Sequence, residues 1–174
     1  MLVLKAQAGD RESMDAVVTR WQPRLRPLAV AWARDEATAD DAIQEMWISV
    51  ARGIRGLRDP ARFGAWAGQI LRRRCTDQAR GAARRRSHET ATRPRAHTDQ
   101  RTESDGQDAL ERAIARLEPE TQAMLRLLYI HAQSIATISE LTGVPEGTVK
   151  SRLHRARATL ADALQAPQDT GVNQ

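Results

Sequence analysis

The chain has 174 residues and a net charge of +5, with 41% hydrophobic but only 3% aromatic residues. This length allows one ordinary domain or two small ones. The basic excess favours a polyanionic partner, although charge alone does not separate nucleic acid from an anionic membrane surface. The one cysteine, Cys75, excludes an intramolecular disulfide and any metal site built from several cysteines, as is typical of a reducing compartment.

Composition also predicts the fold class. Ala, Leu, Arg and Gln dominate, and these residues lose little rotamer freedom in a helix, so we expect an all-α protein. The opening MLVLKAQAGD turns polar too soon for a signal peptide, and no apolar run approaches the roughly 20 residues needed to cross a bilayer. We therefore expect a soluble, cytoplasmic protein without membrane insertion.

The segment 84–108 divides the chain into two modules. It contains no Val, Ile, Leu, Met or aromatic residue, and such a segment buries too little apolar surface to offset the entropy of ordering it. A solvated helix is the alternative, which Pro94 and Gly106 disfavour. We predict two small helical domains, 1–83 and 109–164, joined by a flexible, disordered linker and followed by a short disordered tail, 165–174.

Local signals predict the helices of the first module. Asp10 is placed to cap a helix, and Pro23 suits the start of the next one. Thr38 and Asp41 resemble a capping box with a shorter acid at its end. The turn signal GLRDP precedes the last helix. The expected helices are 10–21, 23–34, 38–53 and 61–82.

The second module ends in a predicted helix-turn-helix. Helices are expected at 109–117 and 119–131, and two more at 134–142 and 145–164. Ser134 is placed to cap the third helix, and the turn Gly143-Val144 separates the last two. A short, glycine-containing turn between two such helices is the helix-turn-helix arrangement.

The last helix carries a narrow apolar seam, formed by Val149, Leu153, Ala156 and Leu160. Small polar and basic residues occupy the opposite side and the flanks. Such a face suits a helix whose first turns enter a DNA major groove, where Lys or Arg reaches guanine acceptors. The alternative is an ordinary solvent-exposed basic helix on a small bundle, with no role in DNA binding.

The stretch GVPEGTVKSRLHRAR resembles the last helix of the extracytoplasmic-function (ECF) sigma factors of bacterial RNA polymerase. The first module resembles the same family in AQAGDRESMDAVVTRWQPRL, in DDAIQEMWISV, and in DPARFGAWAGQIL followed by TDQAR. Nearly the whole chain is covered except the linker and the tail. The resemblance implies two all-helical domains on a flexible tether.

The resemblance also implies roles for three sets of residues. The minus-35 promoter element would be read by Thr148, Lys150, Ser151, Arg152, His154 and Arg155. The minus-10 element would be recognised and opened by the loop 53–62 and the following helix, with Arg58, Phe63, Arg72, Arg73 and Arg80 as candidates. Core polymerase would bind Asp41, Gln44, Glu45 and Ile48, on the opposite face to a core stripe of Ile43, Met46, Trp47 and Val50.

Some of these residues have ordinary structural explanations. Bases beside aromatic rings suit separated single-stranded DNA. Phe63 and Trp66 nevertheless lie three residues apart on one helical face, and we favour a core position for Trp66 while Phe63 stays open. A single exposed apolar residue such as Ile48 is also common on protein surfaces.

The chain departs from the family pattern at several positions. Ala67 and Gly68 stand where relatives usually have a large apolar and an aromatic residue, and Arg73 stands where Asn is common. Inside a helix Gly costs about 1 kcal/mol relative to Ala. The departures predict less efficient strand separation or an unusual minus-10 preference. Ser139 replaces a usual Ala at the helix crossing, where it is small enough to fit.

No phosphate-binding loop, nucleophile elbow or metal-ligand spacing occurs in the sequence, so we expect neither an enzyme nor a cofactor or metal site. The main hypothesis is an alternative sigma factor whose partners are core RNA polymerase, promoter DNA and an anti-sigma factor. The second hypothesis is a stand-alone helix-turn-helix repressor or activator, for which DDAIQEMWISV would have no evident use.

Overall fold

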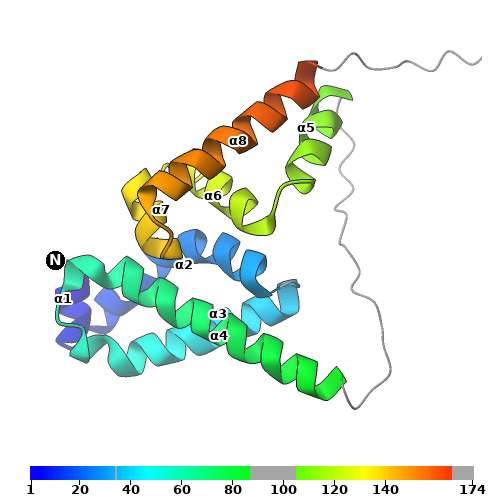
Figure 1. Ribbon diagram of the computed structural model, residues 1–174. Coiled ribbons are helices and arrows are strands. Elements are labelled where there is room, and N and C mark those ends of the chain that lie inside the picture. Colours follow the sequence, from blue (N-terminus) through cyan, green and yellow to red (C-terminus); the bar gives the residue numbers. More distant parts are fainter. Residues whose placement is uncertain (34, 87–104, 166–174) are drawn as a thin grey trace, which may run out of the picture.

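The structure is a computed structural model that describes residues 1–33, 35–86 and 105–165 (Figure 1). Within these ranges every regular element is a helix and no strand occurs. The predicted all-α class is confirmed. The first module contains α1 (Leu2–Gln7), α2 (Arg11–Ala33), α3 (Glu36–Gly53) and α4 (Phe63–Arg86), with short 3-10 turns at η1 (Ile54–Gly56) and η2 (Pro60–Arg62). The second contains α5 (Asp105–Ala115), α6 (Pro119–Tyr129), α7 (Ile135–Thr142) and α8 (Glu146–Gln165).

The predicted break near Pro23 is wrong, because α2 runs unbroken from Arg11 to Ala33 with Pro23 and Pro27 inside it. Proline removes a backbone donor and disfavours a helix interior. Here the buried face continues through both prolines, with Val17 before them and Leu28 after them both fully buried. Burial against the neighbouring helices outweighs the local signal.

The predicted capping box at Thr38 is also wrong. Helix α3 begins earlier, and its cap is Asp35, whose carboxylate accepts a hydrogen bond of 2.8 Å from the backbone N–H of Thr38. By contrast the cap at the start of α2 is confirmed, since the Asp10 carboxylate accepts a 3.2 Å hydrogen bond from Ser13 N–H. The side-chain hydrogen bond from Ser13 lowers the pKa of Asp10 below its usual value.

Helix α1 lies outside the predicted helices, and it docks by side-chain contacts. The amide of Gln7 donates to the backbone oxygens of Ile54 and Leu57, at 2.9 and 2.7 Å. At the other end of the module, α4 extends past the predicted end at 82, and α5 begins before the predicted start at 109. The remainder of the predicted linker, 87–104, and the tail from 166 onward lie outside the described residues.

The core of the first module lies between α2, α3 and α4. Met46, Val50 and Leu71 are fully buried there and Ile43 is buried. The core stripe predicted for the third helix is therefore confirmed at Ile43, Met46 and Val50, whereas Trp47 is only partly buried. Cys75 is also buried, and burial raises the pKa of its thiol to about 11. The thiol therefore stays protonated at neutral pH.

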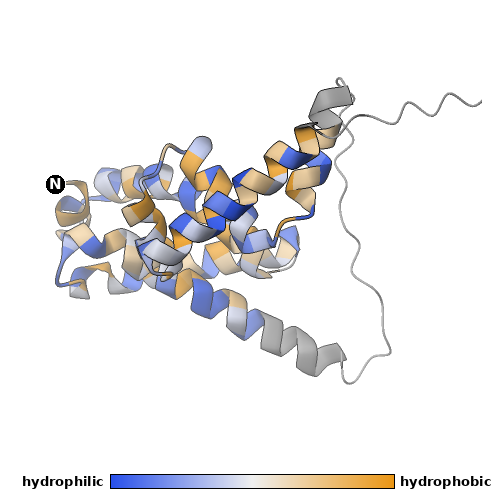
Figure 2. Ribbon diagram, turned by 45° about the horizontal axis from the view of Figure 1, so that its top comes forward, coloured by the Kyte–Doolittle hydropathy of each residue, from blue (hydrophilic) through white to orange (hydrophobic). Residues whose placement is uncertain are grey.

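The predicted helix-turn-helix is present in α7 and α8. The hydroxyl of Ser134 accepts a 3.1 Å hydrogen bond from Thr137 N–H and caps α7. Gly143 ends the helix in the left-handed conformation, with φ of 71°. Three members of the predicted seam of α8, Val149, Leu153 and Ala156, are buried and the fourth, Leu160, is partly buried. Along α8 the hydrophilic residues alternate with these apolar ones (Figure 2).

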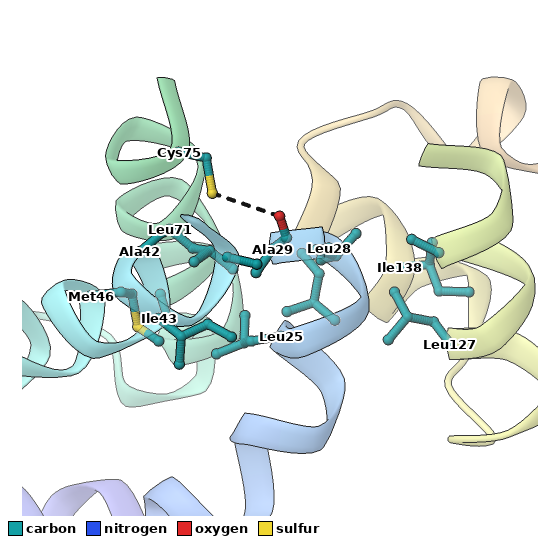
Figure 3. Close-up of a cluster of buried hydrophobic side chains, with 14 of the residues drawn as sticks. Leu25, Leu28, Ala29, Ala42, Ile43, Met46, Leu71, Cys75, Leu127 and Ile138 are labelled. Atoms are coloured by element: carbon teal, nitrogen blue, oxygen red, sulfur yellow. Dashed lines mark hydrogen bonds between the residues drawn. The ribbon is translucent and has the colours of Figure 1, made fainter. Parts of the chain in front are cut away.

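The two modules pack against each other and share one hydrophobic core. Helix α2 contacts α6, and α4 contacts α7. Leu25 of α2 lies toward α3 and α4, whereas Leu28 lies on the side of α2 nearest Leu127 and Ile138 (Figure 3). All four of these side chains are fully buried.

Gly143 offers a test of the helix-turn-helix geometry. We expect Gly143→Ala to lower the free energy of unfolding by about 1 kcal/mol, because a Cβ strains the left-handed backbone. The added Cβ would meet no steric obstacle, since its nearest neighbour is an Arg72 side-chain atom at 3.9 Å. Urea denaturation followed by circular dichroism measures the change. Gly56→Ala is the matched control, because a Cβ there meets nothing within 4 Å and the φ of Gly56 is not positive.

Candidate nucleic-acid and polymerase interfaces

The first candidate surface is the α8 polar face, which we define as Thr148, Lys150, Ser151, Arg152, His154 and Arg155. Five of these six residues are exposed, and Arg152 alone is partly buried. Lys150 forms an exposed ion pair of 3.8 Å with Glu146 one turn earlier, and exposed pairs of this kind hold a side chain only weakly. His154 and Arg155 project from the exposed side of the helix, opposite the buried seam. The face can therefore meet a large polyanion.

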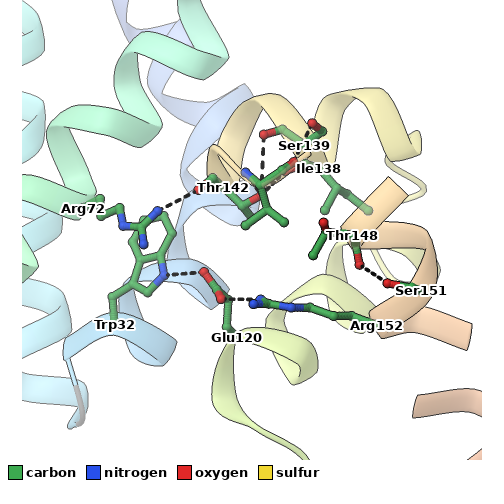
Figure 4. Close-up of polar contacts among 10 residues, drawn as sticks. Trp32, Arg72, Glu120, Ile138, Ser139, Thr142, Thr148, Ser151 and Arg152 are labelled. Carbon is green, nitrogen blue, oxygen red and sulfur yellow. Dashed lines mark hydrogen bonds and ion pairs between the residues drawn. The ribbon is translucent and has the colours of Figure 1, made fainter. Parts of the chain in front are cut away.

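Arg152 is held inside the protein rather than presented to solvent. Its Nη1 donates to Oε2 of Glu120 at 2.6 Å, and both side chains are more than two-thirds buried. The other carboxylate oxygen of Glu120 accepts a 3.3 Å hydrogen bond from the indole N–H of Trp32 in α2 (Figure 4). Sequence reasoning missed Glu120 and Trp32. An acid in the first turn of a helix is ordinary, and Glu120 lies 32 residues from Arg152 along the chain.

The second candidate surface is the α4 basic set, which we define as Arg58, Phe63, Arg72, Arg73 and Arg80. Arg58 is exposed in the turn between η1 and η2, and Arg73 is exposed with a weak ion pair of 3.9 Å to Asp77. Arg72 donates to the backbone oxygen of Thr142 at 3.1 Å. Arg80 belongs to α4, but its side chain lies outside the described part. These residues are thus spread along the loop and helix rather than gathered at one point.

Phe63 lies in the core, where only 1% of its surface is exposed. Its ring packs between Trp21 and Trp66, with centroid distances of 5.5 and 6.0 Å. Phe63 is therefore a core residue in this conformation, and its ring is not accessible to an unstacked base. Trp66 also packs against the core, as favoured from the sequence.

The third candidate surface is the α3 outer face, which we define as Asp41, Gln44, Glu45 and Ile48. All four residues are exposed, and Ile48 is 46% exposed despite its apolar side chain. Beside them an open groove of about 690 Å³ runs between α2 and α3, with Gln44, Trp47 and Ile48 in its lining. Glu45 approaches Arg74 of α4 at 3.7 Å in a half-exposed ion pair. The surface offers an apolar strip edged by acids.

Packing explains the departures from the family pattern at Ala67, Gly68 and Ser139. Ala67 and Gly68 are both buried, and a Cβ on Gly68 would lie 3.2 Å from the carbonyl carbon of Leu141 in α7 and closer still to its oxygen. The hydroxyl of Ser139 donates a 2.6 Å hydrogen bond to the backbone oxygen of Val144 across the helix-turn-helix. Their effect on promoter opening stays a prediction.

Neither a metal-ligand cluster nor a membrane-spanning helix occurs among the residues that the structure describes. Among the residues that the structure describes, no three His, Cys, Asp or Glu side chains are grouped so as to hold a metal ion. None of the helices described is both long and apolar enough to span a bilayer.

Together these surfaces define a class: an all-helical protein with a helix-turn-helix in one module and an exposed face of acids and one apolar residue in the other. Comparison with known proteins gives one family match in each module. The family model "Sigma-70 region 2" matches residues 17–85, and "Sigma-70, region 4" matches residues 107–160. The two matches therefore cover most of the described chain in the order that the resemblance implied.

Individual sigma factors are similar to this chain over nearly its whole length. The ECF RNA polymerase sigma factor SigM of Mycobacterium tuberculosis is 36% identical over 168 residues, which cover 95% of this chain and 84% of SigM. Among solved structures, the sigma factor RpoE of Bartonella quintana, bound to the anti-sigma factor NepR, has a TM-score of 0.61 at 22% identity and covers 88% of this chain and 98% of its own. CnrH, bound to the cytosolic domain of CnrY, has a TM-score of 0.60 at 21% identity and covers 95% and 96%. These two likenesses concern the fold.

The chain belongs to the ECF family of RNA polymerase sigma factors. Sigma factors are transcription initiation factors, and an alternative sigma factor directs promoter recognition. The stand-alone repressor is not favoured, because region 2 is present as well as the helix-turn-helix region.

Proposed function

We propose that this sigma factor divides its work among the three surfaces. The α8 polar face reads the minus-35 element, the arginines of the α4 basic set and the loop 53–62 engage the minus-10 element, and the α3 outer face binds core RNA polymerase. The observation that carries this proposal is the geometry of α8, with a buried seam on one side and exposed polar and basic residues on the other.

The reading role of α8 rests on the chemistry of its exposed side chains. The major groove accepts a helix, and Lys or Arg donors match the two acceptors on the guanine edge. Arg155 is exposed at the C-terminal end of the face and supplies such donors. Thr148 lies in the first turn, where the helix dipole and a hydroxyl favour a phosphate.

The polymerase-binding role of α3 rests on an exposed apolar residue beside a groove. Ile48 lies between the acids of the outer face and the groove lined by Trp47. An apolar centre with a charged rim is typical of protein interfaces. The acids Asp41 and Glu45 suit a basic partner surface.

We infer four further properties. The protein acts in the cytoplasm and has no catalytic activity of its own, because the polymerase supplies the chemistry. The two domains that carry these surfaces are 1–83 and 109–164, with α4 continuing to Arg86 and α5 beginning at Asp105. An anti-sigma factor binds this chain, a proposal supported by RpoE, which is held by the anti-sigma factor NepR in its structure.

The direct test mixes the purified chain with core RNA polymerase. Gel filtration measures whether the two co-elute, and run-off transcription on a genomic promoter library then measures whether discrete start sites appear. Co-elution with discrete starts is the expected result, and it identifies the promoter sequence. Tight binding to duplex DNA without binding to core would instead support the stand-alone regulator.

Arg155→Ala tests the minus-35 role. We expect the holoenzyme affinity for a promoter fragment to fall by about tenfold, since one good contact to a base edge is worth roughly 1–3 kcal/mol. The loss should disappear on a fragment whose minus-35 element is scrambled. Arg157→Ala is the matched control, because Arg157 is an exposed base of the same helix outside the polar face. Equal losses in the two variants would contradict the assignment.

The double variant Glu45→Ala, Ile48→Ala tests the polymerase-binding role. Both side chains are exposed, so we expect the melting temperature to stay nearly unchanged while affinity for core polymerase falls at least about tenfold. Surface plasmon resonance on immobilised core measures the loss. The control pair Leu4→Ala, Glu36→Ala removes one exposed apolar and one exposed acidic side chain elsewhere. Unchanged core affinity in the first pair would remove α3 from the interface.

A further inference from the structure

We propose that α1 is a support for the loop 53–62, and that Gln7 is the positioning residue that fixes the backbone beside Arg58 before DNA binds. The observation that carries this inference is a pair of hydrogen bonds from one side-chain amide to two carbonyl groups of the loop. The inference rests on the proposed function, because Arg58 and this loop are assigned there to the minus-10 element.

Helix α1 is held firmly at the end that carries Gln7. The N–H of Gly9 donates to the oxygen of Ala6 at 3.1 Å. The N–H of Asp10 donates to the oxygen of Lys5, also at 3.1 Å. With the positive φ of 94° at Gly9, these two bonds form a Schellman motif, which satisfies the last carbonyls of a helix. Asp10 then caps α2 directly, so the short helix joins the long one through a fully paired turn.

Apolar packing also holds α1 against the first module. Ala6 is buried, and Leu2 and Val3 are partly buried against the core. Helix α1 contacts both α2 and η1, and it lies at the end of the module where the chain turns from α3 to α4 (Figure 1). Because six residues are too few for an isolated helix to be stable, this packing and the capped turn keep α1 folded.

The Gln7 amide bridges the two ends of η1. Its nitrogen donates to the backbone oxygen of Ile54, the first residue of η1, at 2.9 Å, and to that of Leu57, which follows η1, at 2.7 Å. A side-chain amide has two N–H donors, so both bonds form at once. The N–H of Leu57 also donates to the oxygen of Ile54 at 3.1 Å and closes the turn. One side chain of α1 therefore holds the turn at both ends.

The bond to Leu57 sets the direction of Arg58. A peptide unit is planar, so fixing the oxygen of Leu57 also fixes the plane that contains the N–H and the Cα atom of Arg58. On the other side of Arg58, the Asp59 carboxylate accepts a 2.9 Å hydrogen bond from the N–H of Ala61 and caps η2. Arg58 itself is exposed. Its side chain thus extends into solvent from a backbone that is held on both sides.

A loop fixed in advance binds DNA more selectively than a free one. Ordering the backbone before binding removes that entropic cost from the binding step. The ligand is a separated DNA strand, whose phosphates match the guanidinium of Arg58, and telling one base from another requires protein groups in fixed positions. We therefore expect loss of the Gln7 bonds to reduce discrimination at the minus-10 element, with polymerase binding by α3 and minus-35 reading by α8 unchanged.

Gln7→Met tests the support, because methionine has nearly the length of glutamine and no N–H donor. Gln122→Met is the matched control, since the amide of Gln122 makes a bond of the same kind, at 2.9 Å, to the backbone oxygen of Leu117 in the second module. Gln7→Glu is a second test variant, which keeps the shape and places a carboxylate against the two oxygens. It decides the question if circular dichroism shows that Gln7→Met does not fold.

Amide hydrogen exchange of the full chain, followed by NMR, measures the loop directly. In both Gln7 variants the amide of Leu57 should exchange at least about tenfold faster than in the wild type, because its turn opens more often. The amides of Gly9 and Asp10 should keep their rates, since the capped end of α1 stays paired. Gln122→Met should leave the exchange rate at Leu57 unchanged.

Sequence discrimination measures the consequence for DNA. One probe is a labelled single-stranded oligonucleotide with the minus-10 element of a promoter found by run-off transcription, and the other carries the same bases scrambled. Fluorescence anisotropy with the holoenzyme gives the ratio of the two affinities. We expect this ratio to fall severalfold in both Gln7 variants and to keep its wild-type value in Gln122→Met. A merely destabilised protein would instead lose affinity for both oligonucleotides equally and keep the ratio.

Two results would overturn the inference. One is an unchanged exchange rate at Leu57 in both Gln7 variants. The other is faster exchange with an unchanged affinity ratio, which would make α1 a support of the fold with no part in promoter recognition. Run-off transcription by the wild-type protein keeps the two proposals apart. Initiation at discrete start sites together with either result refutes the role of Gln7 alone, whereas faster exchange at Leu57 in a protein that directs no initiation refutes the proposed function and leaves the hold of Gln7 on the loop intact.

Discussion

The approach of α4 to α7 at Gly68 determines how the two modules sit together. With only a hydrogen at this position, the backbone of α4 lies against Leu141. That distance brings Arg72 to the end of α7 and allows Trp32 to reach Glu120. A larger residue would separate the helices, and the polar contacts beyond the crossing would lose their geometry together.

The forces at this interface have different strengths. Leu28 of α2 and Leu127 of α6 are fully buried, and burying such a side chain is worth roughly 1.5–3 kcal/mol. Polar contacts with partly exposed side chains contribute less, since water and salt screen them. Apolar burial therefore supplies most of the attraction between the modules. The contacts of Arg72 and Glu120 mainly set how the surfaces are aligned.

The three candidate surfaces differ in how exposed their side chains are. The α3 outer face is exposed beside an open groove. In contrast, Arg152 of the α8 polar face is partly buried against Glu120, and Arg72 of the α4 basic set, although exposed, donates to the backbone oxygen of Thr142.

The sequence by itself determined the all-helical class, the exposed and buried sides of α3 and α8, and the helix-turn-helix with Ser134 and Gly143 at its boundaries. These features depend on residues within one or two helical turns, so local periodicity and capping chemistry predict them. Only the tertiary structure decided that α2 continues through Pro23, that Phe63 is buried between two tryptophans, and that Arg152 is held by Glu120. Each of these depends on partners distant in the chain, whose meeting is set by how whole helices pack and not by the local pattern.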